Sequence, residues 1–219
     1  MFSNSSDEES KVDYNIEIKI VILGESGVGK SNLINRYNGG DFNPQSLPNN
    51  SSFFMSKNLK FGEKIYRINI WDTAGQEKYH SLTKIFLNES NIAFIVYAID
   101  NYNSFQKIDF WFDLLKESCG NILTALIGNK RDLYESEQVT ENEAINKAKE
   151  INAEFALTSA LEEDTGFDEI VDKMVKKYIQ NIGESIENEV FKTSIKLGSS
   201  FNINEKNKAE VKRKKMKCC

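Results

Sequence analysis

Runs of hydrophobic residues alternate with amphipathic stretches along most of this chain. Segments rich in Ile, Val, Leu, Phe and Tyr predict β-strands. They are Ile16–Leu23, Phe53–Lys60, Ile65–Trp71, Ile92–Ile99, Ile122–Ile127 and Phe155–Leu157. The second and third segments flank Phe61-Gly62-Glu63-Lys64 and predict a hairpin. Ile92–Ile99 is almost wholly apolar, which is typical of a central parallel strand buried on both faces.

Apolar residues at helical spacing predict helices between these strands. Leu33, Ile34 and Tyr37 indicate a short helix that Gly39-Gly40 ends, and a second helix is expected from Phe105 to Leu115. Two more are predicted, over Thr140–Ile151 and from near Gly166 to Ile179 or beyond. Strands that alternate with helices favour an α/β fold with a mostly parallel six-stranded sheet and helices on both faces. In such sheets, ligands bind at the carboxyl ends of the strands.

Composition and charge divide the chain into a body and two tails. We expect a flexible N-terminus over residues 1–15, a globular domain over residues 16–182 and a basic tail over residues 183–219. Residues 205–219 carry a net charge of +5, so the −5 of the whole chain leaves −10 on residues 1–204. Such an acidic body disfavours nucleic acid as a partner.

The loop after the first predicted helix and the N-terminus give further expectations about how the chain is organised. Asp41–Ser52 holds both prolines and several Asn and Ser residues, and is expected to be a mobile loop. No apolar run reaches the ~18–20 residues of a membrane span. The N-terminus is polar and lacks a hydrophobic signal region, so we expect the protein to stay on the cytosolic side.

A glycine-rich segment follows the first predicted strand. It matches G-x-x-x-x-G-K-[ST] and precedes a predicted helix, the context that such a loop needs. Its residues are Gly24, Glu25, Ser26, Gly27, Val28, Gly29, Lys30 and Ser31. Backbone N–H groups in such loops close around phosphates. We expect Lys30 to contact the β- and γ-phosphates, Ser31 to bind Mg²⁺, and Asn32 to belong to the same site. Alone, the motif predicts only a nucleoside triphosphate, and a glycine-rich turn is the alternative.

The segment Asn129-Lys130-Arg131-Asp132 follows the strand Ile122–Ile127. An Asp carboxylate accepts hydrogen bonds from both N1–H and the 2-amino group of guanine, whereas adenine presents an acceptor at N1 and lacks the amino group. Leaving a buried charge unpaired costs several kcal/mol, on the order of a 10⁴-fold discrimination. Asp132 therefore favours guanine over adenine, although Asn-Lys-x-Asp by itself could also be a solvated turn.

Together with Trp71-Asp72-Thr73-Ala74-Gly75-Gln76 and Thr158-Ser159-Ala160-Leu161, these segments resemble the Ras superfamily of small GTPases. The resemblance spans residues 16–182 and the last two cysteines. It implies a P-loop NTPase small-GTPase fold, with GTP or GDP as the ligand and Mg²⁺ as the cofactor. It also implies that Asn129 braces the loops and that the stem of Lys130 covers the base. Ser159, Ala160 and Leu161 would adjoin the guanine, with the Ala160 backbone reaching its oxygen.

The segment from Trp71 to Gln76 predicts magnesium binding and hydrolysis. Asp72 ends a strand and is expected to hold Mg²⁺ through a water molecule. The Gly75 amide would sense the γ-phosphate, and Gln76 would orient the attacking water. A neutral Gln is sufficient because phosphoryl transfer needs positioning and charge neutralisation more than a strong base. Intrinsic turnover in this mechanism is slow, on the order of 10⁻⁴–10⁻³ s⁻¹, and no residue clearly supplies an arginine in cis, so an activating protein is implied.

Lys30 and Asp72 are 42 residues apart, the interval expected in the Rab branch of this superfamily. The same register puts Phe42 where the family packs an aromatic ring on guanine. It puts Asn49 where the family has a switch threonine that binds Mg²⁺. Three possibilities remain for that ligand: the Asn49 carbonyl oxygen, a hydroxyl of Ser51 or Ser52, or water. We favour water, and with it a first switch that stays loose when GTP is bound.

Phe54, Trp71 and Phe86 give a candidate effector surface. They fall where Rab proteins expose an aromatic triad that receives effector helices, and ordinary core packing is the alternative. The neighbouring segment from Asn50 to Phe54 retains only its final Phe from the Rab pattern.

The chain ends with a cluster of basic residues followed by Cys218 and Cys219. This end is not a C-a-a-X box, because Met216 occupies the fourth position from the end. The two cysteines resemble the Rab signal for double geranylgeranylation. Two lipid chains, or one chain plus basic residues, suffice for anchoring, and each base adds about 1 kcal/mol near an anionic leaflet. A basic tail with incidental cysteines is the alternative.

These features predict a Rab-like GTP/GDP switch in vesicle trafficking. The resemblance implies a guanine-nucleotide exchange factor, a GTPase-activating protein, prenylation and extraction chaperones, and effectors on the switch face. It implies a monomer on the cytoplasmic face of an intracellular membrane, with a soluble GDP-bound cytosolic pool. The main alternative is a GTP-binding membrane adaptor with negligible hydrolysis owing to Asn49. A P-loop ATPase or kinase is disfavoured by Asp132.

Overall fold

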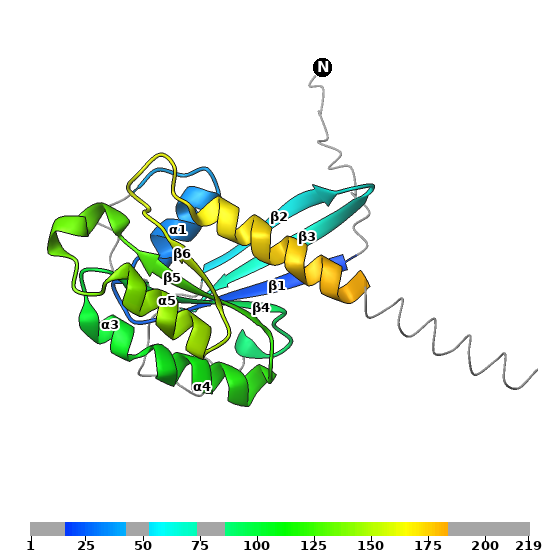
Figure 1. Cartoon of the computed structure of the whole chain (residues 1–219). Helices are drawn as coiled ribbons and strands as arrows, with labels where there is room; N and C mark the ends of the chain where they lie inside the picture. Colours follow the sequence, from blue (N-terminus) through cyan, green and yellow to red (C-terminus); the bar gives the residue numbers. More distant parts are fainter. Residues whose placement is uncertain (1–15, 43–52, 74–85, 184–219) are drawn as a thin grey trace, which may run out of the picture. The chain divides into compact units, whose positions relative to one another are not determined.

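The computed structural model describes residues 16–42, 53–73 and 86–183. These ranges contain a six-stranded sheet with the order β2-β3-β1-β4-β5-β6 (Figure 1). The strands are β1 (Ile16–Leu23), β2 (Phe53–Phe61), β3 (Lys64–Asp72), β4 (Ile92–Ala98), β5 (Leu123–Asn129) and β6 (Glu154–Leu157). Only β2 is antiparallel to its neighbour; the other strand pairs in the described ranges are parallel. The predicted mostly parallel α/β sheet is therefore confirmed.

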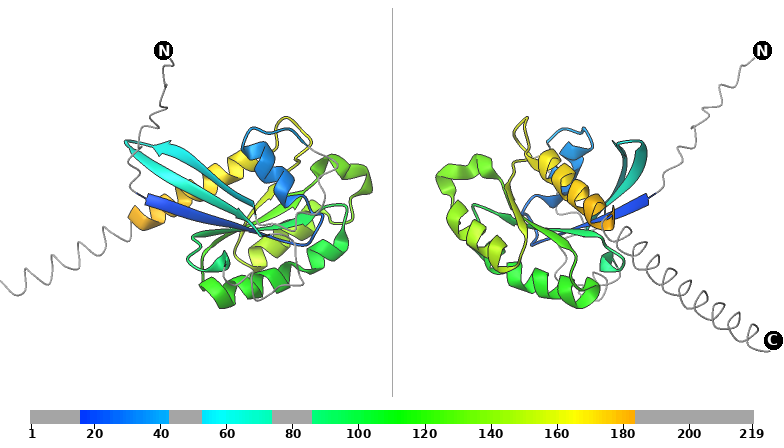
Figure 2. Two further views of the ribbon diagram at one scale, coloured as in Figure 1. Left: turned by 180° about the vertical axis from the view of Figure 1, so that it is seen from behind. Right: turned by 45° about the vertical axis from the view of Figure 1, so that its right-hand side comes forward.

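The chain divides into two units, Met1–Val175 and Lys176–Cys219, and the strands within the described ranges belong to the first. Within that unit, helices cover both faces of the sheet (Figure 2). On one face lie α1 (Lys30–Tyr37) and the first part of a helix over residues 167–183. The Phe167 ring contacts Tyr37 at 5.9 Å and Phe94 at 5.6 Å between centroids.

The other face of the sheet is covered by α4 (Ile108–Cys119) and α5 (Glu141–Glu150). Trp111 from α4 and Ala144 from α5 join one buried cluster with Val21, Leu23 and Ile95 of the central strands. All seven residues of β4 are buried, because this strand lies between β1 and β5 and is covered on both sides. The buried cluster therefore includes residues from the carboxyl-terminal halves of β1 and β4.

Three differences from the sequence-based expectation concern more than the exact end of an element. The β2–β3 pairing runs as far as Phe61 opposite Lys64, so the hairpin turn contains only Gly62 and Glu63. Gly62 has a φ of +61°, which suits glycine and permits this tighter turn. The expected helix from Phe105 is two helices, α3 (Tyr102–Gln106) and α4, which are separated at Lys107. The start of α3 is capped by Asn101, whose side chain accepts from the Ser104 amide.

The third difference concerns the end of β5. This strand continues two residues beyond Ile127 and ends at Asn129. A short 3₁₀ helix, η1 (Arg131–Ser136), which the hydrophobic pattern did not predict, follows it. Asn129 is therefore part of the sheet and is 1% exposed, whereas Asp132 lies in η1.

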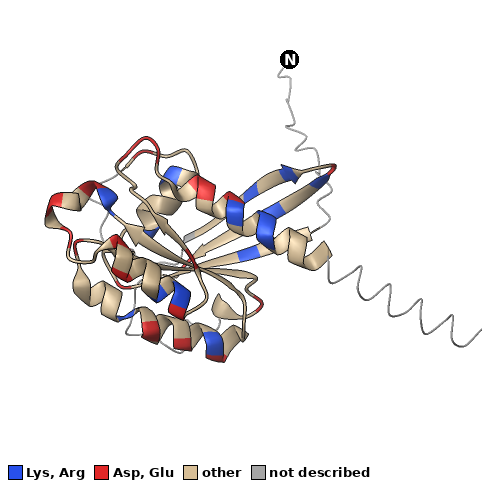
Figure 3. Cartoon of the chain, in the orientation of Figure 1, with Lys and Arg blue, Asp and Glu red and all other residues tan. Residues whose placement is uncertain are grey.

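Charged residues are unevenly distributed over the elements (Figure 3). The β2–β3 hairpin is rich in lysine and arginine, whereas α4 and α5 carry more carboxylates. Lys147 joins the two helices, since its Nζ lies 2.6 Å from Asp109 of α4 and 3.0 Å from Glu150 of α5.

Several predicted features lie outside the described residues. They are the N-terminus over residues 1–15, residues 43–52 of the expected mobile loop, and the tail from residue 184. Among the helices that the structure describes, none has both the length and the apolar character needed to cross a bilayer.

Candidate functional site

The carboxyl ends of β1, β3, β5 and β6 lie along the same side of the sheet, at the ends of its strands, because these four strands are parallel. The glycine-rich loop follows β1, Asp72 ends β3, Asn129 ends β5 and Thr158 follows β6. Segments that are far apart in the sequence are thus brought together at the position where ligands bind in such sheets.

The glycine-rich loop closes around its own lysine. Lys30 begins α1 and is 5% exposed, and its Nζ donates to the carbonyls of Gly24 at 2.7 Å and Glu25 at 2.8 Å. A Cβ on Gly24 would lie 2.1 Å from the Val96 carbonyl oxygen, so no side chain fits there. At Gly27 a Cβ would meet nothing within 4 Å. The loop is therefore packed against the sheet at its start and open in its middle, as a phosphate cradle requires.

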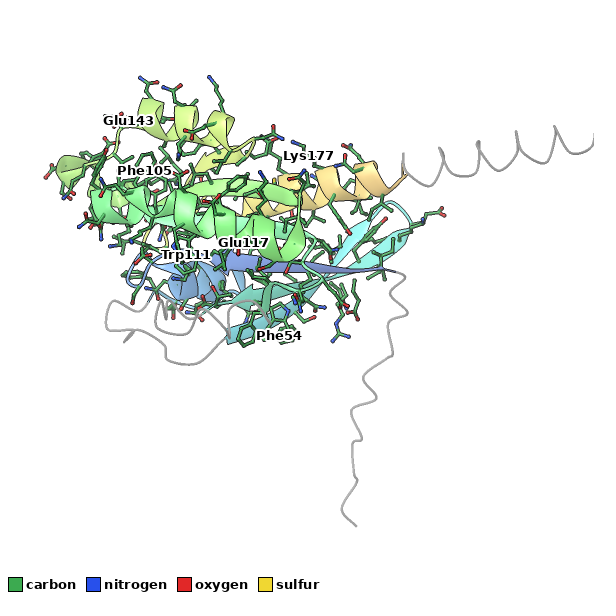
Figure 4. The ribbon with its side chains drawn as sticks, turned by 90° about the horizontal axis from the view of Figure 1, so that it is seen from below. Phe54, Phe105, Trp111, Glu117, Glu143 and Lys177 are labelled. Carbon is green, nitrogen blue, oxygen red and sulfur yellow. The ribbon has the colours of Figure 1, made fainter. Side chains whose placement is uncertain are left out.

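A side chain of this loop also contacts α4. The Trp111 indole donates from Nε1 to Oε1 of Glu25 at 3.1 Å, and Trp111 is 3% exposed. Trp111 is labelled on α4 in Figure 4. From its sequence position, Glu25 was expected only to belong to the loop. The hydrogen bond adds a link between the phosphate loop and the helical layer.

Ser31 and Asp72 form the candidate magnesium site. The Ser31 hydroxyl donates to Oδ2 of Asp72, which is 1% exposed. Oδ1 of Asp72 is buried and has no hydrogen-bond partner among the described residues. Burial raises the pKa of Asp72 above its ordinary value, against the opposing effects of the Ser31 hydrogen bond and the Lys30 charge. A buried carboxylate beside a hydroxyl offers the hard oxygen atoms that Mg²⁺ prefers, so these residues fit that cation.

Asn129 joins the phosphate loop to the strand ends on the other side of the site. Its Nδ2 donates to the Val28 carbonyl at 2.7 Å, and its Oδ1 accepts from the Thr158 hydroxyl at 3.1 Å. All three residues are at most 1% exposed. The resemblance implied a bracing role for Asn129, but neither partner had been identified from the sequence.

Asp132 is held by the segment that follows β6. The Ser159 hydroxyl donates to Oδ1 of Asp132 and accepts from the amide of Leu161 at 3.1 Å. Ser159 is fully buried, Ala160 is 5% exposed and Leu161 is 54% exposed. The carboxylate expected to read guanine is therefore held by Ser159, the residue before Ala160.

Lys130 has a partner that sequence reasoning missed. Its Nζ lies 3.4 Å from Asp100, which follows β4. Lys130 has a φ of +65°, a left-handed conformation that is uncommon for residues other than glycine and concentrates at functional sites. An acidic residue directly after a buried strand was the sequence signal that could have identified Asp100.

The three aromatic residues of the candidate effector surface lie next to one another. Ring centroids are 4.7 Å apart for Phe54 and Trp71, and 6.0 Å apart for Trp71 and Phe86. Phe54 lies on the edge strand β2 and is 47% exposed (Figure 4). Lys19 lies over the Trp71 ring at 5.5 Å. Phe54 is therefore not a core residue, and the aromatic cluster is partly exposed at the surface.

Other predicted site residues fall beyond the described ranges: Asn49, Gly75, Gln76, Cys218 and Cys219. Phe42 is the last described residue before the gap at 43–52, and Asn32 lies within α1. The roles proposed for these residues stay predictions.

Comparison with known proteins identifies the family. The model of the Ras family matches residues 19–180. Ras-related protein Rab-21 of Homo sapiens is 37% identical over 163 residues, which are 74% of this chain and 72% of that protein. Ras-related protein RABA1g of Arabidopsis thaliana is 33% identical over 215 residues, covering 94% of this chain and 95% of that protein. Ras-related protein Rab-11B of Dictyostelium discoideum is 39% identical over 152 residues, 69% of each chain. The chain therefore belongs to the Ras family and is a Rab-like small GTPase.

Proposed function

We propose that this chain is a GTP/GDP switch that works on a membrane in vesicle trafficking and hydrolyses GTP slowly. The observation that carries the proposal is the convergence of four segments on one sheet edge, with Asn129 bonded to both Val28 and Thr158. A site built in this way senses the phosphates and the base together. GTP and GDP can then stabilise different conformations of the adjoining loops.

Guanine selectivity is assigned to Asp132. Its carboxylate would accept from N1–H and the 2-amino group of guanine, while Ser159 holds the carboxylate in position. The Ala160 amide would donate to the guanine oxygen, and Lys130 and Phe42 would cover the two sides of the base. A nucleotide competition assay tests this assignment. ATP should fail to displace a fluorescent GDP analogue, and equal displacement by ATP and GTP would instead indicate a P-loop ATPase or kinase.

Mg²⁺ is assigned to Ser31 and Asp72, and when bound it would neutralise charge on the β- and γ-phosphates. Lys30 would contact the same phosphates, and the Gly75 amide would sense the terminal one. Gln76 would orient the attacking water. For the remaining ligand position we keep water as the choice over Asn49, Ser51 or Ser52, which predicts weak ordering of the first switch.

Single-turnover hydrolysis of bound GTP tests the switch mechanism against the alternative of a GTP-bound adaptor. The variants are Gln76→Leu and Asn49→Thr beside the wild type. Slow wild-type turnover that Gln76→Leu abolishes and Asn49→Thr barely changes would support the switch. If the wild type is as inert as Gln76→Leu and Asn49→Thr restores turnover, the adaptor describes the protein better.

Membrane attachment is assigned to geranylgeranyl groups on Cys218 and Cys219, assisted by the basic residues before them. The proposed partners are an exchange factor, an activating protein, prenylation and extraction chaperones, and effectors on the surface of Phe54, Trp71 and Phe86. The GDP-bound form would be extracted to the cytosol as a monomer. A vesicle flotation assay with prenylated protein tests the anchor: the double variant Cys218→Ser/Cys219→Ser should stay with the soluble fraction, and its continued flotation would refute it.

A further inference from the structure

Arginine side chains from two elements hold the loop after Leu161. Arg131 begins η1, and its guanidinium lies 2.6 Å from Oε2 of Glu162, through both Nε and Nη2. The same Nη2 donates to the carbonyl of Asp164 at 2.5 Å. From the other side, Arg36 of α1 donates from Nη2 to the carbonyl of Glu162 at 3.1 Å. The described part of this loop is therefore tied to both η1 and α1.

Arg131 also contacts the start of the same loop. Its backbone amide donates to the Thr158 carbonyl at 3.0 Å, while its side chain reaches Glu162 and Asp164. One residue thus spans the loop from the end of β6 to the turn before Gly166. At Gly166 a Cβ would lie 3.1 Å from Nη1 of Arg131 and 2.9 Å from the Leu157 carbonyl, so the guanidinium fills the space there.

These contacts continue to the carboxylate that reads the base. The Glu162 amide donates to the Ser159 hydroxyl at 3.3 Å, and that hydroxyl donates to Asp132. A displacement of Glu162 therefore changes a hydrogen bond on Ser159 and, through it, the orientation of Asp132. Ala160, whose amide is assigned to the guanine oxygen, lies inside the segment that Arg131 closes.

The chemistry of the pair suits a positioning role. The guanidinium is planar and offers several donors in a fixed arrangement, so it can bond a carboxylate and a carbonyl at the same time. The side chains of Arg131 and Glu162 are 29% and 40% exposed. A single exposed ion pair contributes little. Here the pair acts together with two backbone hydrogen bonds on the same loop.

We propose that Arg131 and Glu162 form a clamp on the guanine-binding loop and that this clamp sets how slowly the bound nucleotide dissociates. The proposal rests on the guanine-nucleotide site proposed above and adds a determinant of its kinetics. Arg131 and Glu162 act as positioning residues through Ser159, Ala160 and Asp132. Opening the clamp loosens the loop and speeds release of GDP and GTP alike, because both carry the same base.

The test measures dissociation of a fluorescent GDP analogue from the full chain, chased with excess GDP. The Arg131–Glu162 contact is expected to be stronger than an exposed ion pair and weaker than a buried charge-assisted hydrogen bond. Arg131→Ala and Glu162→Ala should therefore each release the analogue about 3–10-fold faster than the wild type. The double variant should match Arg131→Ala, because that change already removes the pair with Glu162 as well as the bond to the Asp164 carbonyl. Arg131→Lys should fall between the wild type and Arg131→Ala. Glu163→Ala is the matched control, because its carboxylate takes no part in the clamp, and should leave the rate unchanged.

Salt gives a second readout that simple loss of packing would not produce. Raising ionic strength screens the exposed pair, so the ratio of the Arg131→Ala rate to the wild-type rate should fall, while the bond to the Asp164 carbonyl keeps it above one. Three results would overturn the clamp. In the first, the effects of Arg131→Ala and Glu162→Ala on the dissociation rate add in the double variant. In the second, Arg131→Lys dissociates the analogue as fast as Arg131→Ala, and in the third the single-variant rates lie within about twofold of the wild type. If an alanine variant does not fold, Arg131→Lys and Glu162→Gln replace the alanine variants. Their dissociation rates are then judged in the same way. A wild type that binds no GDP analogue would instead refute the proposed nucleotide site.

Discussion

Asn129 and Val28 are 101 residues apart in the chain, and the Asn129 side-chain amide donates to the Val28 carbonyl at 2.7 Å. Val28 lies in the phosphate loop, and Asn129 ends the strand that leads to the base-reading turn. Because both residues are buried, this hydrogen bond joins the two halves of the candidate site without competition from water.

Replacing Asn129 by Ala should loosen both halves of the site. The Val28 carbonyl and the Thr158 hydroxyl would each lose a partner, which costs about 1–3 kcal/mol for a buried group left unsatisfied. We expect a lower free energy of unfolding in urea and release of GDP at least about tenfold faster. Asn146→Ala, on the exposed face of α5, is the control. Unchanged GDP release from Asn129→Ala would contradict the bracing role.

Gly24 should tolerate no side chain. A Cβ there would lie 2.1 Å from the Val96 carbonyl oxygen, and Gly24 has a φ of +140°. Gly24→Ala must push the loop away from β4, which we expect to cost about 3 kcal/mol of stability. Gly62→Ala is the matched control, since Gly62 has open space and a φ of +61°, and should cost only about 1–2 kcal/mol. If Gly24→Ala and Gly62→Ala lowered the free energy of unfolding equally, in thermal or urea unfolding, the close approach to Val96 would not be the cause of the destabilisation.

The Glu25–Trp111 hydrogen bond should stabilise the packing of α4 against the phosphate loop. Glu25→Ala leaves a buried indole N–H without its acceptor, at a cost of about 1–3 kcal/mol, whereas Glu25→Gln keeps an oxygen acceptor. Urea unfolding measures the difference. In a Trp111→Phe background, which removes the donor, Glu25→Ala should have little further effect. An undiminished effect in that background would exclude this hydrogen bond as the cause.

The capping box of α5 should make stability depend on pH. The Thr140 side chain accepts from the Glu143 amide at 3.3 Å, and the Glu143 carboxylate accepts from the Thr140 amide at 3.0 Å and from its hydroxyl. These bonds, first from the hydroxyl and then from the amide, lower the pKa of Glu143 below its ordinary value of 4.5. The stabilisation is therefore complete above the unfolded pKa and is lost as the pH falls through the folded one.

Unfolding free energies at several pH values test this dependence. The difference between the wild type and Glu143→Gln should be constant near neutral pH and should shrink once the pH drops below about 4. Thr140→Ala removes the cap and should cost about 1 kcal/mol at neutral pH. Glu141→Gln lies in the same helical turn but outside the capping box, and it serves as the control. If the difference in unfolding free energy between the wild type and Glu143→Gln grew as the pH fell, the Glu143 carboxylate would not be the stabilising form, and the capping-box explanation would be wrong.

The sequence predicted the elements most closely where local signals were strong. The apolar run of β4 and the Gly39-Gly40 stop after α1 depend only on neighbouring residues, and both were recognised. The hairpin turn and the division between α3 and α4 were not predicted correctly. Those boundaries depend on strand pairing as far as Phe61 and on a helix break at Lys107, two features that hydrophobic periodicity does not report.

For the candidate site, the sequence by itself determined the residue types, their order and the chemistry that each can perform. Motif spacing sufficed to assign Lys30, Ser31, Asp72 and Asp132, because the required functional groups lie in the side chains themselves. Tertiary structure alone decided which groups meet. Val28 with Asn129, Glu25 with Trp111, and Arg131 with Glu162 are contacts between distant segments. The first and third arise because parallel strands bring their carboxyl ends together, and the second because α4 packs on the sheet.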